Sequence, residues 1–297
     1  MWPPGIWEFL TLTCKLLIYA TTAGAVGGTF SVRLLAHHSA IQISIRRYIR
    51  WSCVAGLAAS SASFFFQVGA IADLGLRGMF DADLIGILIQ TSNGSSAFTR
   101  TAGFAMMGLA AVESVSTSRF HWIAPSICLT IGGIVILLYS FTTSGHLANA
   151  DVLVQLALVL HVLTVSLWIG SLYPLLRFSQ TDAPSSIQQI MHTFGKVATW
   201  IVLVLLLCGL LLAWLLLEGG SDLLTTNYGR GLGAKIILVV TLLLIAARNK
   251  LRLTPAMLQP GVGARLSLAI RVEILIALLI LLTTAIITVI IGTEAIQ

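Results

Sequence analysis

The chain has 297 residues, of which 57% are hydrophobic and only 9% are charged, whereas soluble domains usually carry about a quarter charged residues. No water-soluble core could bury so much apolar surface, so a soluble fold is excluded. The formal net charge of +6 comes with no Gly-rich phosphate loop and no basic-aromatic surface pattern, which argues against a nucleic-acid partner.

Apolar runs continue from one end of the chain to the other. A helix needs about 20 residues to cross the hydrocarbon. The breaks between the runs therefore predict eight spans, at 7–28, 50–71, 98–116, 122–143, 152–176, 197–217, 231–251 and 268–292. No hydrophilic block between them is long enough to fold alone. We therefore expect an all-α, polytopic transmembrane helical bundle in which residues 1–297 form one transmembrane domain.

Two apolar segments need a separate interpretation. The first run has no basic residue before it and no convincing cleavage site, so it is expected to remain as the first span rather than to be removed as a signal peptide. The run 83–90 (DLIGILIQ) is too short to cross. Its amphipathic pattern predicts an interfacial or re-entrant helix.

The distribution of basic residues predicts the orientation. Short cytoplasmic loops of membrane proteins carry an excess of Lys and Arg. Twelve of the 17 basic residues follow the first, third, fifth and seventh predicted spans, and four follow the second, fourth and sixth. Both termini are therefore expected to face outward, together with the acidic outer loops.

Two classes of chemistry are not expected. The four cysteines stand singly within predicted helices and form no CxxC pair, which argues against a disulfide framework or a thiolate metal site. The sequence also shows no paired carboxylates inside the membrane that could act as general acid and base. We therefore do not expect the chain to be an enzyme.

His161 is the main candidate for a binding role. It follows Val152, where the fifth predicted span begins, by nine residues, which places it about 13 Å into the membrane at 1.5 Å per residue. His146 lies above it at the predicted outer mouth, and Trp168 lies two turns below it on the same helix face. A lone imidazole at this depth is either a ligand or a hydrogen-bonded contact between helices.

Met106 and Met107 lie at a comparable depth in the third predicted span. A thioether together with an imidazole suits Cu(I), because soft ligands select this ion. The alternative is that the pair fills space in an apolar helix.

Lys15 lies equally deep in the first predicted span. It could extend its ammonium group outward to the interface, or it could neutralise a carboxylate or bind an anion inside the bundle. A cation beside a copper path would raise the barrier to copper entry, so Lys15 argues against such a path.

Several motifs resemble the copper resistance protein D (CopD) family of bacterial inner-membrane proteins. They are the SGH of 144–146, the H-x6-W-x-G of 161–170, the T-x-YGRG-x3-K of 226–235, the R-N-K-x-R-x-T-P of 248–255 and the R-x-E of 271–273. The resemblance is strongest over residues 140–290. Arg230 in the third motif is expected at the outer headgroups, and Arg271 is expected to pair with Glu273.

The resemblance implies copper transport across the inner membrane, with import from the periplasm, beside a periplasmic partner of the CopC type. It makes His146 and His161 the best copper candidates. Two alternatives remain open. One is a membrane protein that binds haem b through His161, with Lys15 or Arg230 at a propionate. The other is a scaffold or sensor that docks the periplasmic partner through the acidic outer loops.

Overall fold

The computed structural model describes residues 5–113, 123–143, 150–216 and 226–291, and within these ranges it contains helices and turns but no strand. The all-α prediction is therefore confirmed. Among the described residues, six helices are long and apolar enough to cross a membrane. They are α1 (Ile6–Leu34), α2 (Ser39–Ala72), α6 (Val152–Thr181), α7 (Pro184–Leu216), α9 (Asn227–Arg248) and α10 (Val262–Ile286).

The two remaining predicted spans correspond to α4 (Ser92–Glu113) and α5 (Ile123–Tyr139). These helices exist, but neither is among the six that meet the length and hydropathy of a membrane span. Their crossing of the membrane, and the outward orientation of the termini, stay predictions.

Two helices begin much earlier than their apolar runs. α2 starts at residue 39 rather than 50, and α7 starts at residue 184 rather than 197. In both extensions buried apolar side chains recur at helical spacing, as Ile41 and Ile45 do in α2 and Ile187 and Met191 do in α7. One buried apolar stripe is enough to stabilise an amphipathic helix. Such a stripe is interrupted by polar residues, so these extensions do not form continuous apolar runs.

Between α2 and α4 the chain forms two short helices, η1 (Gly75–Phe80) and α3 (Ala82–Ile89). The side chain of Asp81 accepts a hydrogen bond of 3.0 Å from the backbone N–H of Leu84, which caps the start of α3. The helix predicted at 83–90 is thus confirmed, while its position at the membrane interface stays a prediction.

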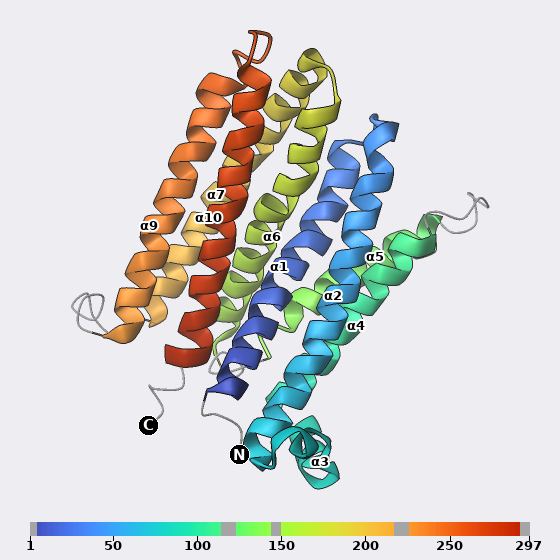
Figure 1. Ribbon diagram of the computed structural model, residues 1–297, viewed down its shortest axis with the longest axis vertical. Helices are drawn as coiled ribbons and strands as arrows, with labels where there is room; N and C mark the ends of the chain where they lie inside the picture. The colour runs from blue at the N-terminus through green and yellow to red at the C-terminus, as the bar shows by residue number, and fades with distance from the viewer. Residues whose placement is uncertain (1–4, 114–122, 144–149, 217–225, 292–297) are drawn as a thin grey trace. The chain divides into compact units, whose positions relative to one another are not determined.

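The chain divides into two compact units. The first comprises Met1–Ala25 and Ile49–Leu163, and the second comprises Val26–Tyr48 and Thr164–Gln297. In the first unit α4 and α5 lie side by side, and in the second α9 and α10 do so (Figure 1).

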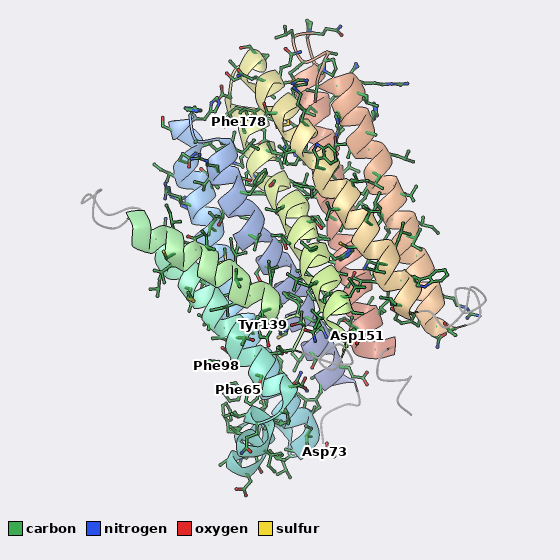
Figure 2. The ribbon with its side chains drawn as sticks, turned by 180° about the vertical axis from the view of Figure 1, so that it is seen from behind. Phe65, Asp73, Phe98, Tyr139, Asp151 and Phe178 are labelled. Carbon is green, nitrogen blue, oxygen red and sulfur yellow. The ribbon has the colours of Figure 1, made fainter. Side chains whose placement is uncertain are left out.

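Large apolar side chains lie on the outer surfaces of the helices. Phe98 and Tyr139, for example, are 76% and 53% exposed, and both are labelled in Figure 2. This distribution suits a hydrocarbon environment, in which apolar side chains face lipid.

Candidate functional site

His161 lies in the third turn of α6, which begins at Val152 as predicted. The imidazole is half-buried, and its Nδ1 atom is shielded from solvent. An imidazole nitrogen in this setting can coordinate a metal or hold a hydrogen bond. His146, its predicted partner at the outer mouth, lies outside the described residues.

Met106 and Met107 face the neighbouring helix α5. A Cβ atom added to Gly132 would lie 2.9 Å from Cε of Met106, and one added to Gly133 would lie 2.7 Å from Cγ of Met107. The two glycines therefore leave the space that the two thioether side chains occupy. Met107 is 2% exposed. This arrangement favours packing between α4 and α5 over metal coordination, at least for Met107.

Arg100 lies in the third turn of α4, because this helix begins at Ser92, six residues before the predicted span at 98–116. The guanidinium donates to the side-chain oxygen of Ser140 at 3.3 Å and to its backbone oxygen at 3.4 Å. It also lies 5.4 Å from the centre of the Phe141 ring, which adds a cation-π contact.

Lys15 belongs to the same unit as Arg100 and lies within electrostatic range of it. Among the described residues, no carboxylate forms an ion pair with either cation. Two positive charges in this setting repel each other unless an anion lies between them. Sequence reasoning considered Lys15 alone. The helix α4 begins with the polar residues SNGSS, so Arg100 lies inside the helix rather than at its end. This extension is the signal that could have placed Arg100 near Lys15.

Trp168 and Gly170, from the H-x6-W-x-G motif, lie in the second unit. Trp168 is 3% exposed. A Cβ atom added to Gly27 of α1 would lie 2.6 Å from Cα of Gly170, and the hydroxyl of Ser171 donates to the carbonyl of Gly27 at 3.4 Å. Small residues let two membrane helices approach closely, so this part of the motif has a packing explanation.

Arg230 lies in the first turn of α9, where it is exposed. Thr226 caps this helix, because its hydroxyl accepts a hydrogen bond of 2.9 Å from the backbone N–H of Gly229. The motif thus forms the start of α9, while the position of Arg230 at the outer headgroups stays a prediction.

The R-N-K-x-R-x-T-P motif joins three helices of the second unit. Asn249 donates to the carboxylate of Glu273 in α10 at 2.7 Å, and Lys250 donates to the hydroxyl of Thr199 in α7. Gln188 of α7 donates to the carbonyl of Pro255 at 3.0 Å. The predicted pairing of Arg271 with Glu273 is wrong: Arg271 is exposed, and the buried Glu273 accepts its hydrogen bond from Asn249 instead.

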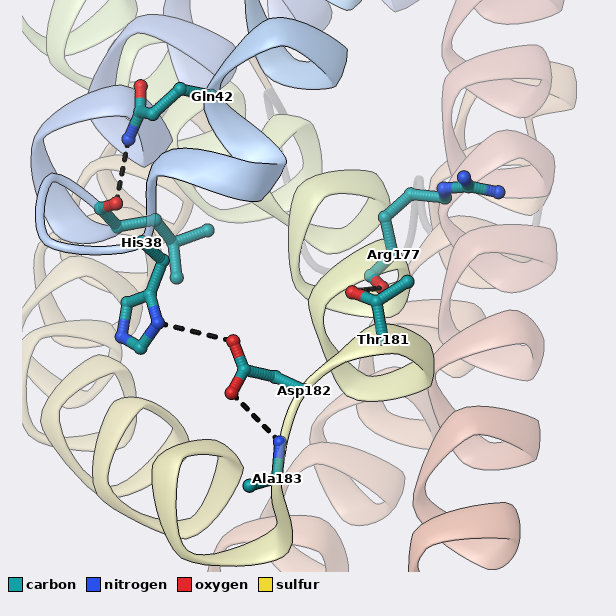
Figure 3. A network of polar contacts seen from close by, with 7 residues as sticks. His38, Gln42, Arg177, Thr181, Asp182 and Ala183 are labelled. Atoms are coloured by element: carbon teal, nitrogen blue, oxygen red, sulfur yellow. Dashed lines mark hydrogen bonds and ion pairs between the residues drawn. The ribbon is translucent and has the colours of Figure 1, made fainter.

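His38 connects the α1–α2 turn to the end of α6 (Figure 3). Its Nδ1 lies 3.2 Å from the carboxylate of Asp182, and its ring meets the Phe178 ring at a centroid distance of 4.7 Å. The other oxygen of Asp182 accepts from the backbone N–H of Ala183 at 2.8 Å. These contacts give His38 a structural role at the end of α6.

The described residues contain no group of three or more His, Cys, Asp or Glu side chains that could hold a metal ion.

Six apolar helices with polar contacts between them define a multi-pass α-helical membrane protein. Residues 188–287 match the family described as Copper resistance protein D, which confirms the resemblance predicted from the motifs. This match covers most of α7 and all of α9 and α10 but includes neither His146 nor His161.

The chain is 26% identical over 210 residues to the copper transport protein CutJ of Bacillus subtilis (strain 168). This alignment covers 68% of the chain and 37% of that relative, so the chain spans much less than the whole of it. No solved structure matches the chain significantly.

Proposed function

We propose that this chain transports copper across a bacterial inner membrane, with import from the periplasm as the direction. The CopD-family region and the name of the relative CutJ support copper as the cargo. The observation that carries the proposal for the chain's own residues is the placement of His161, half-buried in a helix long enough to span the membrane.

The chemistry of this residue suits transient binding of Cu(I). An imidazole nitrogen is a good ligand for copper. A transported ion must bind tightly enough to enter and weakly enough to leave, which a site with one or two ligands achieves. Met106 is half-buried and keeps a thioether that could assist, whereas Met107 is committed to packing on Gly133.

The test is copper accumulation in cells that express His161→Ala. Uptake is expected to fall to the background level while the amount of folded protein in the membrane stays unchanged. His192→Ala is a matched control, because His192 is exposed on α7 and should not affect uptake. Normal copper accumulation with His161→Ala would exclude the proposed path.

A second function, binding of haem b, is favoured by one specific observation. Arg100 and Lys15 together offer two cations in the same unit as His161, and such groups suit the carboxylates of haem propionates. Haem, if bound, would be held by His161 and would supply electron-transfer chemistry. An absorption spectrum of the purified protein tests this alternative, and a colourless preparation would eliminate it.

The proposed partner is a periplasmic copper-binding protein of the CopC type. Asp73, Asp81, Asp83 and Asp151 supply acidic groups that are exposed or half-buried and available for docking on the predicted outer side. If the chain is a scaffold or sensor rather than a transporter, copurification with this partner should survive His161→Ala. If the partner only delivers copper, acidic-loop substitutions should weaken both copurification and uptake.

A further inference from the structure

A buried polar pair lies between α10 and the end of α9. Glu273 is 4% exposed and Asn249 is 7% exposed. Glu273 follows Val262, where α10 begins, by 11 residues, or about 16 Å along the helix axis. The Asn249 side-chain N–H donates to Oε1 of Glu273 at 2.7 Å. Both residues belong to the region that matches the CopD family.

Asn249 stands where the backbone changes from α9 to a π turn. Asn249 opens η3 (Asn249–Leu253), a short π-helical segment that continues α9. The backbone N–H of Thr254 donates to the carbonyl of Asn249, five residues earlier, at 2.9 Å. A π turn holds one residue more than an α turn and so changes the direction of the side chains beyond it. Such turns occur frequently at functional sites.

The pair is not balanced if Glu273 is ionised. A carboxylate only accepts hydrogen bonds, and Oδ1 of Asn249 is buried with no donor among the described residues. An ionised Glu273 would therefore be a buried charge with one hydrogen bond, from Asn249. The amide oxygen of Asn249 beside it would be a buried acceptor with no donor. Burial of an ion costs more than a single hydrogen bond returns.

The neighbouring charges do not compensate. No ion pair to Glu273 occurs in the part of the chain that the structure describes. The titratable or cationic side chains on the surrounding segments of α7, α9, η3 and α10 are all exposed: His192, Lys196, Arg248, Lys250, Arg252, Arg265 and Arg271.

A proton on Glu273 corrects both defects at once. It removes the buried charge, and it supplies an O–H donor on the side chain that already contacts Asn249, whose amide oxygen has no donor among the described residues. A carboxylic acid and a primary amide each carry one donor and one acceptor on the facing edge, so they are complementary. The same pair with the proton removed is not.

We propose that Glu273 and Asn249 form a proton-binding site, in which Glu273 is a neutral acid in the conformation described and gives up its proton when the contact between α9 and α10 opens. Proton binding does not depend on copper. The role of this proton as the ion that drives transport rests on the function proposed above.

Infrared spectroscopy of the purified protein in lipid tests proton binding. The carbonyl band of a buried, protonated carboxylic acid is expected in the wild type at neutral pH and should be absent in Glu273→Gln. It should shift in Asn249→Leu, which removes the hydrogen-bond partner, and stay unchanged in Asp83→Asn, since Asp83 is exposed. A Glu273→Gln spectrum identical to that of the wild type in this region would overturn the proposal.

Transport by reconstituted protein tests the coupling. Glutamine is a neutral isostere of the acid and can form the amide pair, so Glu273→Gln should fold and bind copper. Copper flux in the wild type should change at least several-fold with an imposed pH gradient, and flux in Glu273→Gln should not respond to it. An equal response in both proteins would refute the coupling. If the wild type moves no copper, the proposed function fails, and the infrared result still decides the proton site.

Discussion

A Cβ atom placed on Gly27 would lie 2.6 Å from the Cα atom of Gly170, so α1 and α6 meet in the second unit almost backbone to backbone. The hydroxyl of Ser171 donates to the carbonyl of Gly27 across this contact. Gly170 belongs to one of the motifs that resemble the CopD family. In this structure its lack of a side chain lets α1 approach α6 closely.

Gly27→Ala should destabilise the protein. The added methyl group meets backbone rather than a flexible side chain, so one helix must move, at a cost of about 1–3 kcal/mol or more. The measurement is thermal unfolding of the purified protein in detergent. Gly233→Ala is the matched control, because a Cβ atom there has no neighbour within 4 Å and alanine favours the helix by up to about 1 kcal/mol. Equal melting temperatures for the two variants would contradict the close approach.

Met107→Leu should leave copper uptake close to the wild-type level. Leucine has nearly the same volume, and such exchanges in a packed interior usually cost less than about 1.5 kcal/mol. Gly133→Leu, by contrast, should separate α4 from α5, because the Met107 side chain already fills that space. Uptake assays and thermal unfolding of both variants check this. Loss of uptake in a stable Met107→Leu protein would make the thioether a ligand.

Lys15→Gln should increase the rate of copper uptake. Lys15 and Arg100 lie within electrostatic range of each other, and two cations oppose the entry of a third positive charge. The measurement is initial uptake at low copper concentration. Arg33→Gln removes an exposed cation from the same helix and serves as the control. A lower rate in Lys15→Gln would indicate instead that the ammonium group holds an anion that uptake requires.

His38 and Asp182 should be energetically coupled. A double-mutant cycle with His38→Ala and Asp182→Ala is expected to give a coupling free energy of about 0.2–1 kcal/mol, because both side chains are about a quarter exposed and solvent screens the pair. Unfolding by denaturant provides the measurement. His37→Ala, at the exposed neighbouring position, should show no coupling to Asp182.

The sequence predicted the helical class and the approximate position of the eight long helices in the described residues, because continuous apolar runs mark them directly. It did not predict the early starts of α2 and α7. There a single stripe such as Ile41 and Ile45 is buried, and the surrounding residues are polar. The predicted span at 98–116 likewise began six residues after the start of α4, because the first turns of this helix are polar.

The contacts between helices were harder to predict. Single-helix depth placed Met106 and Met107 in the hydrocarbon, but depth does not say which neighbour a side chain faces. Arg271 and Glu273 are two residues apart on α10 and so do not face each other, and the sequence does not show that Asn249 of a separate segment meets Glu273. His161 was placed in the correct turn, while its role as a ligand stays a prediction.

The π turn at Asn249–Leu253 contains one residue more than an α turn would. Deleting a single residue there would restore regular α geometry and rotate the preceding helix by about 100° relative to the residues after the turn, so Asn249 would no longer meet Glu273. Homologues that are one residue shorter in this turn should therefore also lack the acid on the facing helix. Among related chains, a one-residue deletion at this position should therefore occur together with loss of the buried acid.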